Sequence, residues 1–308
     1  MYVRKTKKPN PCRTPELLPP SVDVVFKLLF GDERHKGILA AFLTAVLGFR
    51  VLTRDITLLD PHLKRNYPKD KLGVLDVRLR LRNKKLINVE MQVENKKGIR
   101  GRLEYYISKS IADQMQESDD YTKLTPTVMI LVSKRTVLRE TKEYHSEFGT
   151  IEKSKHFELH GLRAIHILEL SKLPKNSNSR LVDWLRFINA TQKEDFMTLT
   201  QECKHLAKAL NALANTSANA EARAIYENRL KAARDKKAEF DYLLDEERAA
   251  AKKRMRKALA EERKATAKAT ADAIAKTMAA EGIDAKTIAK LTGGRPKISN
   301  SKLKSLKP

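Results

Sequence analysis

The chain has 308 residues, of which 62 are Lys or Arg and 38 are Asp or Glu, so its formal net charge is +24. A hydrophobic content of 41% excludes a disordered chain, and two cysteines are too few for a disulfide-stabilised scaffold. The longest apolar stretch, residues 37–49, is too short to cross a bilayer, and no apolar core of a secretory signal follows the basic start. We therefore expect a cytoplasmic protein with a polyanionic partner, nucleic acid ahead of a membrane surface. Charge that only aids solubility is the competing interpretation.

Composition divides the chain into four parts. Residues 1–20 form a basic, Pro-rich arm, and residues 21–190 mix aromatic, β-branched and turn residues as a folded α/β domain does. Residues 191–280 form a helical extension rich in Ala, Lys, Glu and Arg. Residues 281–308 combine a short helix-turn-helix-like piece with a basic tail. The extension has no sustained heptad, so a homo-oligomer through this segment stays an open alternative.

The elements of the folded part follow from periodicity and from turn residues. Ser21 is the expected N-cap of the first helix, and Gly48 ends the second. A helix between two strands favours a parallel crossover, so we expect an α/β fold with a mixed central sheet flanked by helices. The predicted helices are 23–30, 38–47, 101–116 and 181–188, and the predicted strands are 74–81, 86–93, 127–132 and 164–170.

The strands 74–81 and 86–93 read as a hairpin that carries acidic side chains. Glu90 and Gln92 are two residues apart on one strand, so they lie on the same face. A three-residue turn at 83–85 places Arg78 opposite Glu90 and makes Asp76 a diagonal neighbour of Glu90. Two such carboxylates can share a divalent ion, and oxygen ligands suit Mg²⁺ or Mn²⁺ better than zinc. The competing interpretation is an ordinary cross-strand pair of Arg78 with Glu90 on a solvated face.

Four segments together resemble the recombination-promoting nuclease family, the PD-(D/E)XK nuclease-family transposases. They are DVVFKLLFG at 23–31, LDV at 75–77, NVEMQ at 88–92 and RLEYY at 102–106. The resemblance runs from about residue 17 to 188 and touches 278–293. It implies a restriction-endonuclease-like core in which Asp76 and Glu90 hold a metal ion, the Met91 carbonyl adds a ligand, and Gln92 stands where a Lys is usual.

The Gln in place of Lys raises the question of which residue supplies positive charge. Gln92 can donate a hydrogen bond but carries no charge. Lys27 and Lys109 are candidates for a displaced cation, with ordinary exposed lysines as the alternative. Asp23 either adds a metal-binding carboxylate or only favours the N-terminus of its helix. Arg78, Arg80 and Arg102 are expected to contact phosphates, and the two lysines are expected to bind DNA as well.

These patterns predict a metal-dependent DNA endonuclease linked to recombination or mobile-element DNA, with Asp76, Glu90 and Gln92 as catalytic residues, DNA as the partner and no membrane. The alternative is a catalytically inactive DNA-binding or assembly protein that keeps the fold. If Asp76 and Glu90 lay on opposite faces or far apart, the nuclease interpretation would be wrong.

The segment 278–293 predicts two short helices around a turn. Gly282 is the expected C-terminal stop of one helix and Asp284 the N-cap of the next. The spacing resembles half of a helix-turn-helix, although Gly294 and Pro296 interrupt the continuation. A small helical tail that packs on a partner is the alternative.

Overall fold

A computed structural model describes residues 16–63, 74–94 and 97–293 of the chain. These residues belong to two compact units, which meet between Leu230 and Lys231 and are described separately below. Residues 1–15 of the predicted arm and the basic tail after Gly293 lie outside the described residues. Within the described part, no helix is long and apolar enough to span a membrane.

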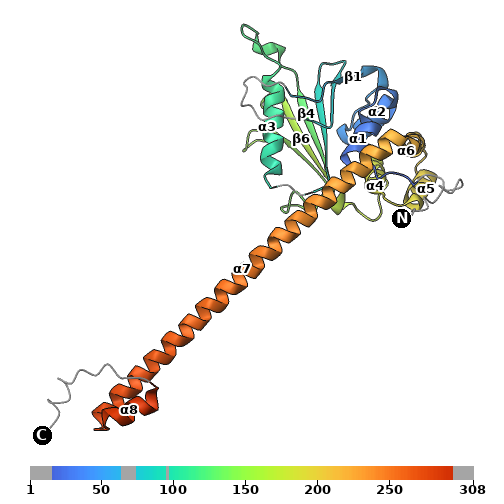
Figure 1. Ribbon diagram of the computed structural model, residues 1–308. Helices are drawn as coiled ribbons and strands as arrows, with labels where there is room; N and C mark the ends of the chain where they lie inside the picture. Colours follow the sequence, from blue (N-terminus) through green and yellow to red (C-terminus); the bar gives the residue numbers. More distant parts are fainter. Residues whose placement is uncertain (1–15, 64–73, 95–96, 294–308) are drawn as a thin grey trace, which may run out of the picture. The chain divides into compact units, whose positions relative to one another are not determined.

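The first unit is built on one six-stranded sheet with the strand order β1-β2-β3-β4-β6-β5. β3 pairs with β4, and β4 with β6, in parallel, while the other neighbours are antiparallel. The mixed sheet flanked by helices, predicted from the order of elements, is confirmed (Figure 1). The strands are β1 Ile56–Leu59, β2 Val77–Leu81, β3 Leu86–Gln92, β4 Thr127–Ser133, β5 His145–Gly149 and β6 Arg163–Glu169.

Helices cover both faces of this sheet, because successive strand residues point to opposite sides. On one face, Ile87 and Val89 of β3 pack into the larger core, which contains Trp184. On the other, Met129 and Leu131 of β4 pack under α3 (Figure 1). The larger core is covered by α1 Asp23–Phe30, α2 Lys36–Leu47, α4 Arg180–Asn189, α5 Lys193–Glu202 and α6 Ala207–Ala218, and the smaller core by α3 Ile99–Ala112.

The ends of the first helices follow local chemistry, with one correction. Gly48 closes α2 in the left-handed conformation at φ 72°, as expected, because glycine adopts it without strain. The residue at the N-cap of α1 is Val22, not Ser21, and it makes no side-chain cap. Ser21 is instead buried in the first unit. Asp23 in the first turn still places negative charge at the helix start.

The hairpin of β2 and β3 forms, but its register differs from the expected one. Arg78 lies opposite Asn88, two residues away from the expected Glu90. The reason is the turn: the Leu81 N–H donates to the Lys85 carbonyl at 2.9 Å, so the loop is residues 82–84. Lys84 adopts a left-handed φ of 66°, as the last residue of a three-residue hairpin loop does. A shift of two keeps every side chain on its expected face.

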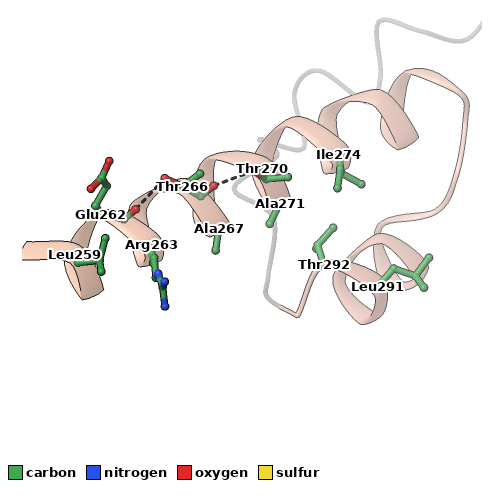
Figure 2. A pocket seen from close by; sticks show the side chains of 10 residues that line it. All are labelled: Leu259, Glu262, Arg263, Thr266, Ala267, Thr270, Ala271, Ile274, Leu291 and Thr292. Carbon is green, nitrogen blue, oxygen red and sulfur yellow. Dashed lines mark hydrogen bonds between the residues drawn. The ribbon is translucent and has the colours of Figure 1, made fainter. Parts of the chain in front are cut away.

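The second unit consists of a helical hairpin. α7 Ala220–Ala280 begins in the first unit and continues into the second, where a turn with Gly282 at φ 83° leads to α8 Ala285–Thr292. The predicted N-cap is present, since Asp284 accepts the N–H groups of Lys286 and Thr287. Ile288 of α8 is buried. An open groove between the two helices is lined by Leu259, Glu262, Arg263, Thr266, Ala267, Thr270, Ala271, Ile274, Leu291 and Thr292 (Figure 2).

Candidate active site

A half-buried and a buried carboxylate, Asp76 and Glu90, meet where β2 begins and β3 ends. Asp76 directly precedes β2, and Glu90 lies near the carboxyl end of β3. The Asp76 Oδ2 atom accepts the Met91 N–H at 2.7 Å, which ties the strand entry to β3. Glu90 is only 4% exposed. The structure thus brings together the two acids that the hairpin pattern pairs, despite the shifted register.

The environment of this pair favours the protonated forms. The pKa of Glu90 is raised to about 8, first by burial and then by the negative charge of Asp76, while Arg102 and Lys27 act in the opposite direction. The pKa of Asp76 is also raised, again chiefly by burial, against the Met91 N–H and Lys27, which lower it. Buried carboxylates that repel one another are stabilised by a proton or by a cation between them.

Arg102, the fourth residue of α3, lies against the acids from the helix side. Its Nη2 donates to Glu90 Oε2 and to Gln92 Oε1, each at 3.0 Å. Its guanidinium also stacks over the ring of Tyr106, 5.5 Å from the centroid. The Gln92 amide is held at its other end, where Nε2 donates to the Glu94 carbonyl at 2.7 Å. Gln92 is therefore fixed in orientation and engaged at both polar atoms.

Lys27 approaches from α1, on the other side of the sheet. Its Nζ lies 3.2 Å from Asp76 Oδ1. The side chain is 38% exposed, so its charge is shared between the acid and solvent. The structure therefore places one of the two lysine candidates at the carboxylates. Asp23 lies close enough for its charge to raise the pKa of Asp76, but its own Oδ2 pairs with Arg229 at 2.9 Å.

The donor set fits a hard cation. Glu90 Oε1 is buried and has no hydrogen-bond partner among the described residues. An orphaned carboxylate oxygen beside a second carboxylate is a costly arrangement that a bound cation relieves. The donors nearby are oxygens, which favour Mg²⁺, Mn²⁺ or Ca²⁺ over zinc. Within the described ranges, no group of three or more His, Cys, Asp or Glu residues could hold a metal, so backbone and solvent oxygens would have to complete the site.

Three of the residues expected at phosphate lie elsewhere. Arg78 donates to the carbonyls of Asp60 and His62, at 3.5 and 3.4 Å, and does not form the cross-strand pair with Glu90. Arg80 is exposed and lies opposite Leu86, at the amino end of β3. Lys109, with its Nζ 3.8 Å from Asp113 Oδ1, has a partner on its own helix α3. Within the described residues, Lys27 and Arg102 are the expected cations whose contacts with the carboxylates the structure shows.

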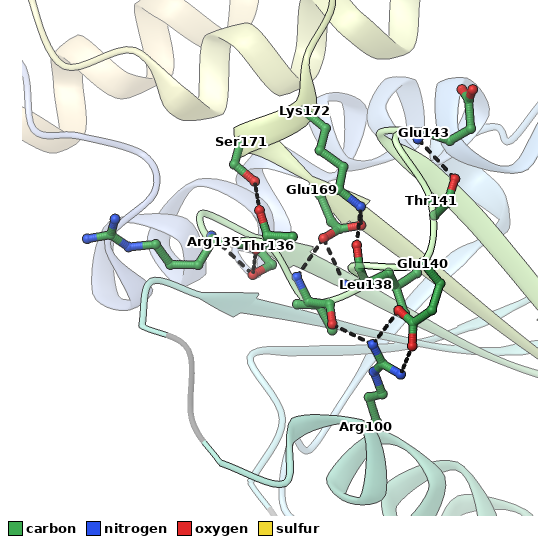
Figure 3. Close-up of polar contacts among 12 residues, drawn as sticks. Arg100, Arg135, Thr136, Leu138, Glu140, Thr141, Glu143, Glu169, Ser171 and Lys172 are labelled. Atoms are coloured by element: carbon green, nitrogen blue, oxygen red, sulfur yellow. Dashed lines mark hydrogen bonds and ion pairs between the residues drawn. The ribbon is translucent and has the colours of Figure 1, made fainter.

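A basic loop that the sequence interpretation missed lies beside Gln92. The Lys134 N–H donates to the Gln92 carbonyl at 2.9 Å, so the segment after β4 begins at this edge of the sheet. Figure 3 shows the polar contacts that hold the segment, among them those of Glu169. A signal was available, since Lys134 and Arg135 directly follow a buried strand, and ligands of such sheets bind at the carboxyl ends of strands.

The groove of the second unit shares no residue with this site. Its lining combines apolar side chains and threonines with one acid and one base (Figure 2). None of the sequence-predicted site residues lies among the residues that line it.

A family model described as PD-(D/E)XK nuclease family transposase matches residues 20–243. The match begins just before α1 and runs through the whole sheet into α7. No curated protein and no solved structure matches the chain.

Proposed function

The chain belongs to the PD-(D/E)XK nuclease family transposases, and from that premise we propose that it is a metal-dependent DNA endonuclease that hydrolyses phosphodiester bonds, acting on recombination or mobile-element DNA. One observation carries the proposal: the half-buried Asp76 lies beside the buried Glu90, and an oxygen of Glu90 has no hydrogen-bond partner among the described residues. A bound cation would stabilise such a pair of carboxylates.

Asp76, Glu90 and the backbone carbonyl of Met91 would hold Mg²⁺ or Mn²⁺, with Asp23 as a further carboxylate. When bound, such an ion polarises a phosphoryl oxygen and lowers the pKa of an attacking water. The Met91 N–H keeps the Asp76 carboxylate turned toward β3. Asp23 must leave Arg229 to join, which makes it the least engaged of the proposed ligands.

Lys27 and Arg102 supply the positive charge that Gln92 lacks. Both contact the carboxylates from opposite faces of the sheet. On binding of the cation and the phosphate, these side chains are positioned to turn from the carboxylates to the phosphoryl oxygens, where developing negative charge needs stabilisation. Gln92 holds the Arg102 guanidinium through its Oε1 atom and thereby orients it.

The alternative, a catalytically inactive DNA-binding protein, has its own support. Lys27 pairs with Asp76 and Arg102 pairs with Glu90, so the two acids are already balanced by two bases. In that case the four side chains form a structural network that needs no cation.

Plasmid nicking separates the two. The purified chain is incubated with supercoiled DNA and Mg²⁺ or Mn²⁺, beside Asp76→Ala and the control Asp60→Ala, which removes an exposed Asp near the hairpin. We expect Asp76→Ala to lose activity on the order of 100-fold or more, since loss even of groups that only support a metal ligand costs 10- to 100-fold. The control should keep it. Equal cleavage by Asp76→Ala would reject the site, and no cleavage by the unmodified chain would favour the inactive protein.

A further inference from the structure

The loop of residues 134–140 follows the carboxyl end of β4 and borders the candidate active site. Gln92 and Ser133 are partners in the parallel ladder of β3 and β4. The next residue, Lys134, donates its N–H to the Gln92 carbonyl at 2.9 Å. Ser133 itself bonds the backbone of Arg135, donating from Oγ to the carbonyl at 2.7 Å. The loop therefore starts at a fixed distance from Gln92.

A buried carboxylate anchors the middle of this loop. Glu169, at the end of β6, is 0% exposed and lies opposite Ser133 in the sheet. Its Oε1 accepts the N–H groups of Val137 at 2.6 Å and Leu138 at 3.1 Å. Its Oε2 pairs with Lys172 at 2.5 Å (Figure 3). Burying a carboxylate is energetically unfavourable unless it is well hydrogen-bonded. A buried carboxylate that binds two backbone N–H groups of the loop therefore indicates that the loop needs a fixed shape.

A second anchor comes from α3. Arg100 donates to both carboxylate oxygens of Glu140, at 2.7 and 2.8 Å, and to the Val137 carbonyl at 2.8 Å (Figure 3). Such a two-pronged contact fixes orientation as well as distance. The loop is thus held at its start by β3, in its middle by β6 and at its end by α3.

The same loop presents three cations that these anchors leave unpaired. Arg135 and Arg139 are exposed, and Lys134 is half-buried. Within the described part of the chain, none of the three has an acidic partner, whereas Arg100 and Lys172 beside them do. Figure 3 shows the Arg135 side chain extending away from the anchoring cluster. Three like charges on one fixed loop repel one another unless an anion joins them.

We propose that residues 134–140 form a loop that binds the DNA backbone next to the active site, with Lys134, Arg135 and Arg139 contacting phosphates and Glu169 as a positioning residue. The inference rests on the proposed function for the identity of the polyanion. Contacts of this kind fix the register of a duplex without reading its sequence. They would hold the strand beside the carboxylates.

The test measures duplex binding by fluorescence anisotropy at several salt concentrations, in EDTA so that no cleavage occurs. The variant Lys134→Gln/Arg135→Gln/Arg139→Gln is compared with Arg82→Gln/Lys153→Gln/Lys155→Gln. The control removes three exposed charges of the same unit from the opposite, amino-terminal edge of the parallel strands. Each phosphate contact contributes about 0.9 to the slope of log affinity against log salt. We expect the loop variant to lower that slope by about 2 to 3 and the control to lower it far less.

The variant Glu169→Ala is measured in the same way. On net charge alone, the loss of an acid should strengthen binding to DNA, but loss of the anchor should weaken it and reduce the slope. Equal slopes for the loop variant and its control, or tighter binding by Glu169→Ala, would overturn the loop assignment. If the unmodified chain binds DNA but the loop variant and its control have equal slopes, only the loop assignment fails. If the unmodified chain does not bind DNA, the proposed function fails as well. Trp184 fluorescence, from the buried and only Trp, shows that each variant is folded.

Discussion

Glu90 has a pKa far above the ordinary value of a glutamate. Its pKa of about 8 results from burial and from Asp76, and the ion pair with Arg102 does not offset them. At neutral pH the side chain therefore holds a proton when no cation is bound. A metal ion must displace that proton, so cation binding and proton release are coupled.

This coupling predicts how stability depends on pH. The folded protein keeps the Glu90 proton up to about pH 8, whereas in the unfolded chain the group loses it near 4.5. Stability is therefore greatest below the unfolded pKa and falls as pH rises through this window, by at most about 1.4 kcal/mol per pH unit. Glu90→Gln, which mimics the protonated side chain, should flatten this decline. Urea unfolding in EDTA at pH 5, 6.5 and 8 measures it, and parallel pH profiles for the two proteins would contradict the raised pKa.

The sequence predicted the two acids but not which cations contact them. Alternation along the hairpin put Asp76 and Glu90 on one face, and that parity survives a register error of two. The contact of Lys27 with Asp76 depends on how α1 packs over the sheet, which no local pattern contains. Lys109 has the residue type of a displaced cation, but it meets Asp113 one turn further along its own helix.

Among the elements, the β2–β3 turn controls the register of the acidic face. Lys84 holds a left-handed conformation, which costs a residue with a Cβ roughly 1–2 kcal/mol. Lys84→Gly should relieve part of this strain and stabilise the first unit by up to about 1 kcal/mol, net of backbone entropy. Lys84→Val should destabilise it, because a β-branched side chain fits this conformation worst. Shifts of the urea midpoint in opposite directions are the expected result, and two shifts of equal sign would argue against this turn.

The loop after β4 depends on its buried anchor in a way that can be measured separately from DNA. Glu169→Ala leaves Lys172 and two backbone N–H groups without their partner, and breaking a buried ion pair costs about 3–5 kcal/mol. The matched control is Glu140→Ala, which breaks the exposed pair with Arg100 at the same loop. We expect a large fall in the urea midpoint for the first and no change for the second. Similar effects of both would mean that Glu169 is not the main anchor.

Strands with strong hydrophobic signals were predictable, and those without were not. β4 is apolar from Val128 to Val132, and its predicted bounds differ from the observed ones by one residue. β5 has the sequence HSEFG, with no alternation, and exists because it pairs with the edge of β6. β1 is only four residues long and follows a helical turn. α3 starts at Ile99 and stops at Ala112, earlier at both ends than its apolar stripe suggested. Its early start follows from Gly98, which adopts a φ of 80° at the N-cap.

At the level of the whole molecule, the core of the first unit is complete before the middle of α7. The last residue that packs against the larger core is Tyr226, and the first unit ends at Leu230. Beyond that point α7 exposes large side chains such as Phe240 and Met255. The family match ends at residue 243, just after this transition.

This division predicts that the chain truncated after residue 243 folds like the full chain. Trp184, the only Trp, reports on the larger core alone, so its fluorescence follows the first unit without a contribution from α8. We expect the free energy of unfolding reported by Trp184 in urea to agree between the two chains within about 0.5 kcal/mol, since distant sites contribute independently. A markedly lower midpoint for the truncated chain would show that the second unit supports the core.

The three parallel strands β3, β4 and β6 are synthesised one after another, so the parts of the site that they carry form in that order. Gln92, Ser133 and Glu169 end three neighbouring strands, yet about 40 residues separate each from the next in the chain. The acids belong to a local hairpin, which closes quickly, whereas the basic loop acquires its anchor only when Glu169 has been synthesised and paired. During translation the chain therefore carries its acidic pair well before it carries a formed basic loop. On the proposals above, the basic loop would be the last part of the site to form, because its anchor Glu169 is the last of these three strand ends to be synthesised.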